Sequence, residues 1–144
     1  MLVSAAQLLA GVAGQVLALR DRRAFDIALI HWRGDPGRVA RDSWLLGTGL
    51  SAPVAMLVAQ TVATVRLAAT PSPTAARTLQ GLGVVMTCGY LVEREFREAF
   101  TAPGSDRVVT PVAAAGFAFA VAMAVAPDEN GHRLLPREPN RRIV

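Results

Sequence analysis

Long stretches without charge alternate with short charged islands along this chain. No charged residue occurs in three windows, which are residues 1–19, 43–65 and 108–127. A fourth window, Thr78–Val92, is shorter and lies between Arg77 and Arg94, whose long side chains can reach a membrane interface. A helix needs roughly 20 mainly apolar residues to cross about 30 Å of hydrocarbon. The pattern therefore predicts an all-α fold, an integral membrane four-helix bundle.

The predicted transmembrane domain covers residues 1–127, and residues 128–144 form an exposed C-terminal tail. We expect spans at about residues 2–19, 45–65, 78–95 and 108–126. Pro53 lies inside the second span, where a proline is tolerated as a kink because neighbouring groups satisfy the freed carbonyl. After the third apolar run, the polar residues up to Phe100 are expected to continue the same helix.

The segment 24–33 is too short to span but carries Phe25, Trp32 and flanking arginines. Aromatic and basic residues together are typical of the headgroup level. We expect a short helix that lies at the interface or extends the first span out of the bilayer.

Two other interpretations fit the sequence less well. A soluble, alanine-rich bundle would show charge at every turn of an apolar stripe, whereas these windows are apolar all round. A cleaved signal peptide over residues 1–19 would begin with basic residues, and Met1–Gln7 contains none.

The composition also indicates in which membrane the protein lies and on which side its termini lie. All 15 basic residues are arginine, which favours a GC-rich bacterial genome and hence the cytoplasmic membrane. Islands 20–41 and 94–107 hold more arginines than the opposite loop and tail, which favours cytoplasmic connections and both termini outside. The pI near 10.9 would also suit a nucleic-acid-binding protein, but arginines at span ends meet anionic lipid headgroups, so no nucleic acid is expected.

Small residues at a spacing of four predict close helix contacts in lipid. Three spans carry such ribbons, namely Ala6, Ala10, Gly14 and Ala18; Gly47, Ser51, Ala55, Ala59 and Ala63; and Ala114, Ala118, Ala122 and Ala126. They predict tight packing along those faces, within one chain or in a homo-oligomer.

Glu93 is the first candidate for chemistry. It directly follows an apolar run and lies three residues after Tyr90, so both are expected on one helical face. Ionisable groups near membrane depth are functional candidates, and a desolvated carboxyl group can serve as a general acid or base. The alternative is a helix-end ion pair of Glu93 with Arg97.

The second candidate pair is His31 and Asp26, with His31 as a base near neutral pH or as an ordinary interfacial histidine. If the charged islands share one membrane face, Arg41, Asp42 and Arg97 join them as candidate substrate-binding residues. No metal site or cofactor is expected, because the two histidines are far apart and no nucleotide motif is present. The lone Cys88 is expected to be a packing residue.

These residues predict a cofactor-independent acid–base enzyme, an isomerase, cyclase or hydrolase, that acts on a lipophilic small molecule in the bilayer. The alternative is a non-catalytic assembly or accessory subunit that packs through its Ala/Gly faces. A transporter is disfavoured, since no inverted repeat and no mid-span charge is visible.

Overall fold

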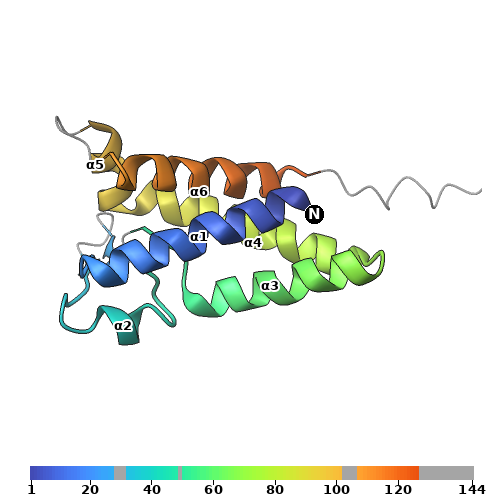
Figure 1. Cartoon of the computed structure of the whole chain (residues 1–144), viewed down its shortest axis with the longest axis horizontal. Helices are drawn as coiled ribbons and strands as arrows, with labels where there is room; N and C mark the ends of the chain where they lie inside the picture. Colours follow the sequence, from blue (N-terminus) through green and yellow to red (C-terminus); the bar gives the residue numbers. More distant parts are fainter. Residues whose placement is uncertain (28–31, 49, 102–106, 127–144) are drawn as a thin grey trace, which may run out of the picture.

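The computed structural model describes residues 1–27, 32–48, 50–101 and 107–126. This part of the chain is mostly helical, as predicted. Its elements are α1 (Leu2–Arg20), β1 (Asp26–Ile27), β2 (Trp32–Arg33), α2 (Val39–Asp42), α3 (Val54–Ala69), α4 (Pro73–Val92), α5 (Arg94–Thr101) and α6 (Val109–Ala124). The helices α1 and α4 each pack against both α3 and α6, so the four long helices enclose one core. The short elements α2 and α5 lie at the same end of these helices (Figure 1).

The end of α1 excludes the helix expected over residues 24–33. Arg22 adopts a positive φ of 52°, and the backbone N–H of Arg23 donates to the carbonyl of Ala18 at 2.8 Å. This is a Schellman-type helix end, which turns the chain out of the helix. Beyond it, β1 and β2 pair as antiparallel strands with Asp26 opposite Arg33. The expectation of a helix in this segment is therefore wrong for its described residues.

The second long helix begins at Val54, later than the expected start at residue 45. Pro53 is its N-cap, with φ −50° and ψ 142°, and is no kink inside a span. A proline disfavours helical geometry in the residue before it, which explains the boundary. Upstream, Gly47 has a φ of +82° and Thr48 pairs with Ser51, so the described residues of 43–48 and 50–53 form turns and no helix.

The third long helix begins before residue 78 and ends before residue 95. Ser72 caps it by accepting a hydrogen bond from the backbone N–H of Ala75, and Pro73 occupies the first turn. Glu93 then takes an extended backbone, with φ −74° and ψ 126°. The expected continuous helix is thus broken at Glu93, and α5 is a separate element.

The small-residue ribbons match the packing only in part. Gly14 and Ala18 are buried in α1, but Ala55, Ala59 and Ala118 are exposed. The buried face of α6 consists of Val109, Ala113, Gly116, Ala120 and Met123. Gly83 of α4 packs closely against this face, since a Cβ there would lie 2.6 Å from the backbone nitrogen of Ala124. A close contact between α4 and α6 therefore involves a glycine outside all three ribbons.

The core contains polar side chains, and the outer flank is apolar. Gln7 and Gln60 are completely buried, whereas Leu2 is 84% exposed and Leu9 is 73% exposed. Gln60 Nε2 donates to the backbone oxygen of Ser4 at 2.9 Å, and Ser4 and Thr64 share a hydroxyl hydrogen bond of 2.6 Å. By length and apolar composition, one helix of the described residues, α1, can cross a membrane, while α3 and α6 are apolar but shorter.

Candidate functional site

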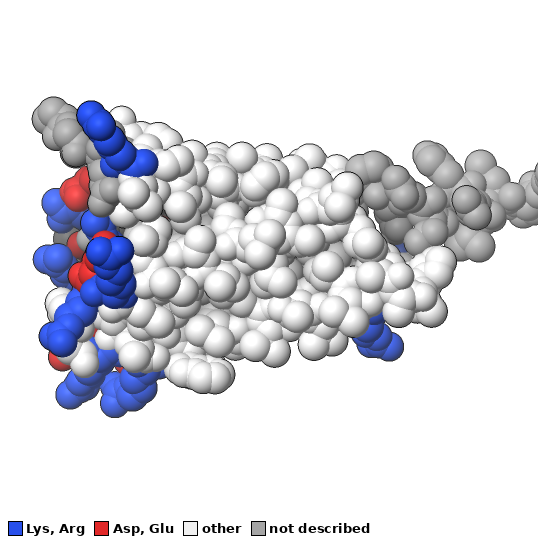
Figure 2. Space-filling view, in the orientation of Figure 1, with Lys and Arg blue, Asp and Glu red and all other residues white. Residues whose placement is uncertain are grey.

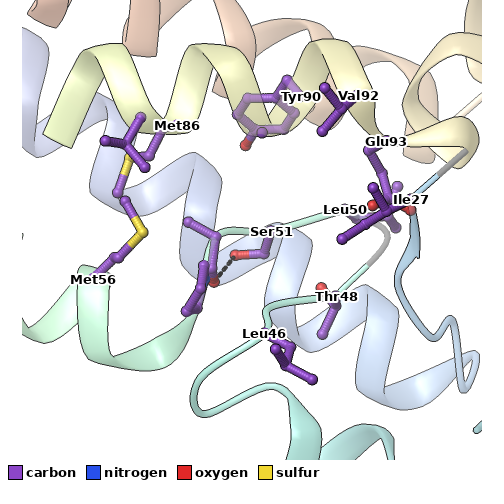
Figure 3. A pocket seen from close by; sticks show the side chains of 14 residues that line it. Ile27, Leu46, Thr48, Leu50, Ser51, Met56, Met86, Tyr90, Val92 and Glu93 are labelled. Carbon is purple, nitrogen blue, oxygen red and sulfur yellow. Dashed lines mark hydrogen bonds between the residues drawn. The ribbon is translucent and has the colours of Figure 1, made fainter. Parts of the chain in front are cut away.

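A cavity of about 190 Å³ lies between α3, α4 and the loop that precedes α3 (Figure 3). Most of its walls are aliphatic or thioether side chains, and its polar groups come from Thr48, Ser51, Tyr90 and Glu93. Met56 and Met86 lie at one end and Glu93 at the other, with Ile27 beside it. Such a mostly apolar pocket with a few convergent polar groups is typical of small-molecule sites.

Glu93 is positioned by a contact between distant parts of the chain. Its extended backbone pairs with Ile27 of β1, and its Oε1 accepts a 2.7 Å hydrogen bond from the backbone N–H of Asp26. Glu93 is only 8% exposed. The break after α4 thus turns this carboxylate toward β1 and the cavity, while the backbone N–H of Arg97 donates to the backbone oxygen of Glu93 at 3.4 Å, one helical turn further on.

Tyr90 lies one turn before Glu93 and lines the same cavity. Its ring packs against Phe96 and Phe117, with centroid distances of 5.2 and 6.2 Å. Gly116 of α6 makes room for it, since a Cβ there would collide with the Tyr90 hydroxyl oxygen. The structure therefore brings together the two residues that were expected to share a face, although the helix ends between them.

Thr48 supplies a hydroxyl group that the sequence did not indicate. Its Oγ1 is buried and has no hydrogen-bond partner among the described residues, whereas Ser51 Oγ donates to the backbone oxygen of Gly11 at 2.8 Å. A buried polar atom without a partner is unfavourable, so it marks a place where a ligand or a water molecule would bind. In the sequence, only Gly47 and Pro53 signalled the position of Thr48, because these two residues favour a loop between them over a helix.

The other candidate residues that the structure describes do not line the cavity. Asp26 lies 3.7 Å from Arg33 in an ion pair. Arg41 and Asp42 pair with each other at 3.3 Å on α2, and Arg97 is exposed on α5. His31 lies outside the described residues. Because Arg41, Asp42 and Arg97 do not line the cavity, nothing supports the expectation that they bind a substrate there.

Next to Glu93 along the chain, Arg94 and Glu98 of α5 form an ion pair. Arg94 Nε lies 2.6 Å from Glu98 Oε1, and this hydrogen bond and charge, together with the charge of Asp26, raise the pKa of Arg94 above its ordinary value. No group of three His, Cys, Asp or Glu residues that could hold a metal ion occurs within the described ranges.

Comparison with known proteins adds nothing to these observations, because no family model, no curated protein and no solved structure matches the chain.

Proposed function

We propose that this chain is a small integral membrane protein of the bacterial cytoplasmic membrane. The observation that carries the proposal is the inverted distribution of polarity, with glutamines inside and large aliphatic side chains outside. Gln7 and Gln60 are fully buried, while Val16, Val62 and Val65 are each more than half exposed. Figure 2 shows charged side chains gathered at the end that carries α2 and α5, next to a broad uncharged flank. A soluble helical protein shows the opposite arrangement.

Aromatic side chains support a membrane interface at the charged end. Trp32, Trp44 and Phe100 are each about half exposed or more, at 46%, 60% and 52%. Aromatic rings of this kind are enriched at the level of lipid headgroups. In this arrangement α3 and α6 require local thinning of the bilayer, because 16 residues rise only about 24 Å.

The single cysteine provides a test. Cys88 is exposed on the flank of α4, so in a soluble protein it would react readily with a charged maleimide. In native membrane vesicles we expect no reaction at Cys88 until the membrane is dissolved in a denaturing detergent. A Cys88→Ser, Arg38→Cys variant is the matched control, because Arg38 lies at the charged end and should react in vesicles opened to both sides. Rapid labelling of Cys88 in intact membranes would refute the membrane proposal.

For activity, we propose that the cavity binds a lipophilic small molecule and that Glu93 acts on it as a general acid or base. The supporting observation is that Glu93 and Tyr90, the two ionisable residues of the described lining, reach the same mostly apolar cavity. A carboxylate enclosed in such a site can move a proton at the polar end of a ligand without a cofactor. Tyr90 would orient the ligand from the side wall.

Two glycines of α4 allow a matched test of binding. A Cβ at Gly89 or at Gly81 meets no atom within 4 Å, so both positions accept a larger side chain. Gly89 lines the cavity and Gly81 does not. We therefore expect Gly89→Phe to abolish labelling of the cavity walls by a diazirine-bearing ten-carbon alcohol, and Gly81→Phe to leave it intact. Equal labelling of both variants at Met56 and Met86 would refute the binding site.

A further inference from the structure

We propose that Thr48 recognises the ligand of this cavity by donating a hydrogen bond to a carbonyl or hydroxyl oxygen of an otherwise apolar molecule, such as a medium-chain ketone or alcohol. This role rests on the proposed binding site, and it adds the class of ligand and the group that selects it. A hydrocarbon without such an oxygen should bind less well.

Thr48 is held in the cavity wall by its own backbone. Its N–H donates to the backbone oxygen of Ser51 at 3.0 Å, and the N–H of Ser51 donates to the backbone oxygen of Thr48 at 3.4 Å. Thr48 is only 5% exposed, lines the cavity, and carries its hydroxyl oxygen on the side that faces α4 (Figure 3). The two backbone hydrogen bonds therefore hold this side chain at the cavity.

The hydroxyl group of Thr48 has no partner in the part of the chain that the structure describes. Its Oγ1 is completely buried, although both backbone polar groups of the residue are paired. A buried hydroxyl group without a hydrogen bond lowers the stability of the protein. A ligand oxygen at this place supplies the missing bond, since a threonine hydroxyl can donate one hydrogen bond. A hydrocarbon leaves the oxygen unpaired.

Two other polar side chains of the lining already have partners. Ser51 Oγ donates to the backbone oxygen of Gly11 at 2.8 Å. Glu93 Oε1 accepts a hydrogen bond from the backbone N–H of Asp26 at 2.7 Å. Among the described lining residues, Thr48 thus carries the one completely buried side-chain oxygen that lacks a partner.

The rest of the wall favours an apolar body for the ligand. The lining consists mainly of aliphatic and thioether side chains, among them Leu46, Met56 and Met86. The cavity measures about 190 Å³, and an apolar cavity of about 150 Å³ in another protein holds benzene. One short hydrocarbon chain that carries a single oxygen therefore suits this site in both size and polarity.

Thr48→Val provides the first test, because it removes the hydroxyl group and keeps the shape of the side chain. We expect its unfolding midpoint in detergent to rise by about 2–4 °C, since a buried oxygen without a partner is lost. The same change should weaken binding of a ligand that carries an oxygen. Removal of a hydroxyl group with a purely structural role would instead lower the midpoint.

Competition by two neutral molecules measures the binding. The diazirine-bearing ten-carbon alcohol labels the cavity walls in detergent, and the mole fraction of 2-octanone or octane in the micelle that halves the labelling is determined. From wild type to Thr48→Val, the preference for 2-octanone over octane should fall about tenfold, which corresponds to about 1.4 kcal/mol. Partition into the micelle cancels in this comparison, because it is the same for both proteins. Thr48→Ser is the matched control, since it keeps the hydroxyl group and should keep most of the preference.

The outcomes separate this role from the proposed site. An unchanged preference in Thr48→Val, with labelling still blocked by Gly89→Phe, would leave the site intact and overturn the role of Thr48. Loss of the preference in Thr48→Ser as well would also overturn it, because the hydroxyl group would not be what selects the ligand. A lower midpoint of Thr48→Val would show that the hydroxyl group already has a partner, such as a water molecule. If Gly89→Phe leaves labelling unchanged, the proposed binding site itself fails.

Discussion

The backbone N–H of Asp26 donates to Glu93 Oε1 at 2.7 Å, and the two residues lie 67 positions apart in the sequence. This contact joins the short β1 strand to the extended residue between α4 and α5. It fixes both the orientation of the carboxylate and the loop that closes one end of the cavity. Hydrogen bonds with a charged acceptor are among the stronger ones in proteins.

Loss of this acceptor should loosen the charged end of the molecule. We expect Glu93→Ala to lower the free energy of unfolding by about 1–3 kcal/mol, since a buried N–H then lacks its partner. Glu93→Gln keeps an oxygen acceptor and should retain most of that stability. Thermal unfolding in detergent measures both, with the exposed Glu98→Gln as a control that changes little. Equal loss in the Ala and Gln variants would contradict the role of the hydrogen bond.

The contact between α4 and α6 should be intolerant of a single methyl group. A Cβ at Gly83 lies 2.6 Å from the nitrogen of Ala124 and 2.8 Å from the oxygen of Ala120, both rigid backbone atoms. We expect Gly83→Ala to destabilise the fold by about 1–3 kcal/mol, as overpacking does. Gly81→Ala, on the open side of the same helix, should be neutral or gain up to about 1 kcal/mol from helix propensity. The same effect at both positions would exclude this packing.

The interior glutamines should differ in how they respond to an apolar replacement. Neither side-chain polar atom of Gln7 has a hydrogen-bond partner among the described residues, whereas Gln60 Nε2 donates to Ser4. Gln7→Met should therefore leave stability unchanged or raise it by about 1 kcal/mol, because it removes an unsatisfied buried amide. Gln60→Met should lower stability, by about 0.6 kcal/mol if the bond has the average strength for helices in lipid. Clear destabilisation by Gln7→Met would reveal a partner for Gln7, such as a buried water molecule.

The loop before α3 should depend on the backbone conformation of Gly47. Its φ of +82° is unfavourable for other residues, and a Cβ there would lie 2.8 Å from the Ser51 backbone oxygen. We expect Gly47→Ala to destabilise the protein by about 1–3 kcal/mol and to weaken labelling of the cavity, because Leu46 and Thr48 shift with the loop. Gly37→Ala, in an exposed turn with a negative φ, is the matched control and should preserve labelling.

The absence of charge predicted two of the long helices well, α1 and α6. Helix α1 ends within one residue of its expected limit, and α6 lies inside the expected fourth span. The second span failed because hydropathy does not distinguish a buried loop from a helix, although Gly47 and Pro53 marked the loop. The helical spacing of Tyr90 and Glu93 predicted that the two side chains lie close together. It did not reveal the β1 contact, which depends on packing between segments far apart in the sequence.

The late start of α3 has a consequence for the surrounding lipid. With α3 three residues shorter than its neighbour α1, by 16 against 19, the two apolar helices differ in length by about 4.5 Å. In the proposed membrane location, a bilayer that matches one helix is mismatched at the other, so the annulus of lipid around the protein becomes asymmetric. The mismatch lies beside the loop that walls the cavity. If the protein lies in a bilayer as proposed, acyl-chain length should therefore affect this loop and the cavity beside it, and thin bilayers should suit the protein best.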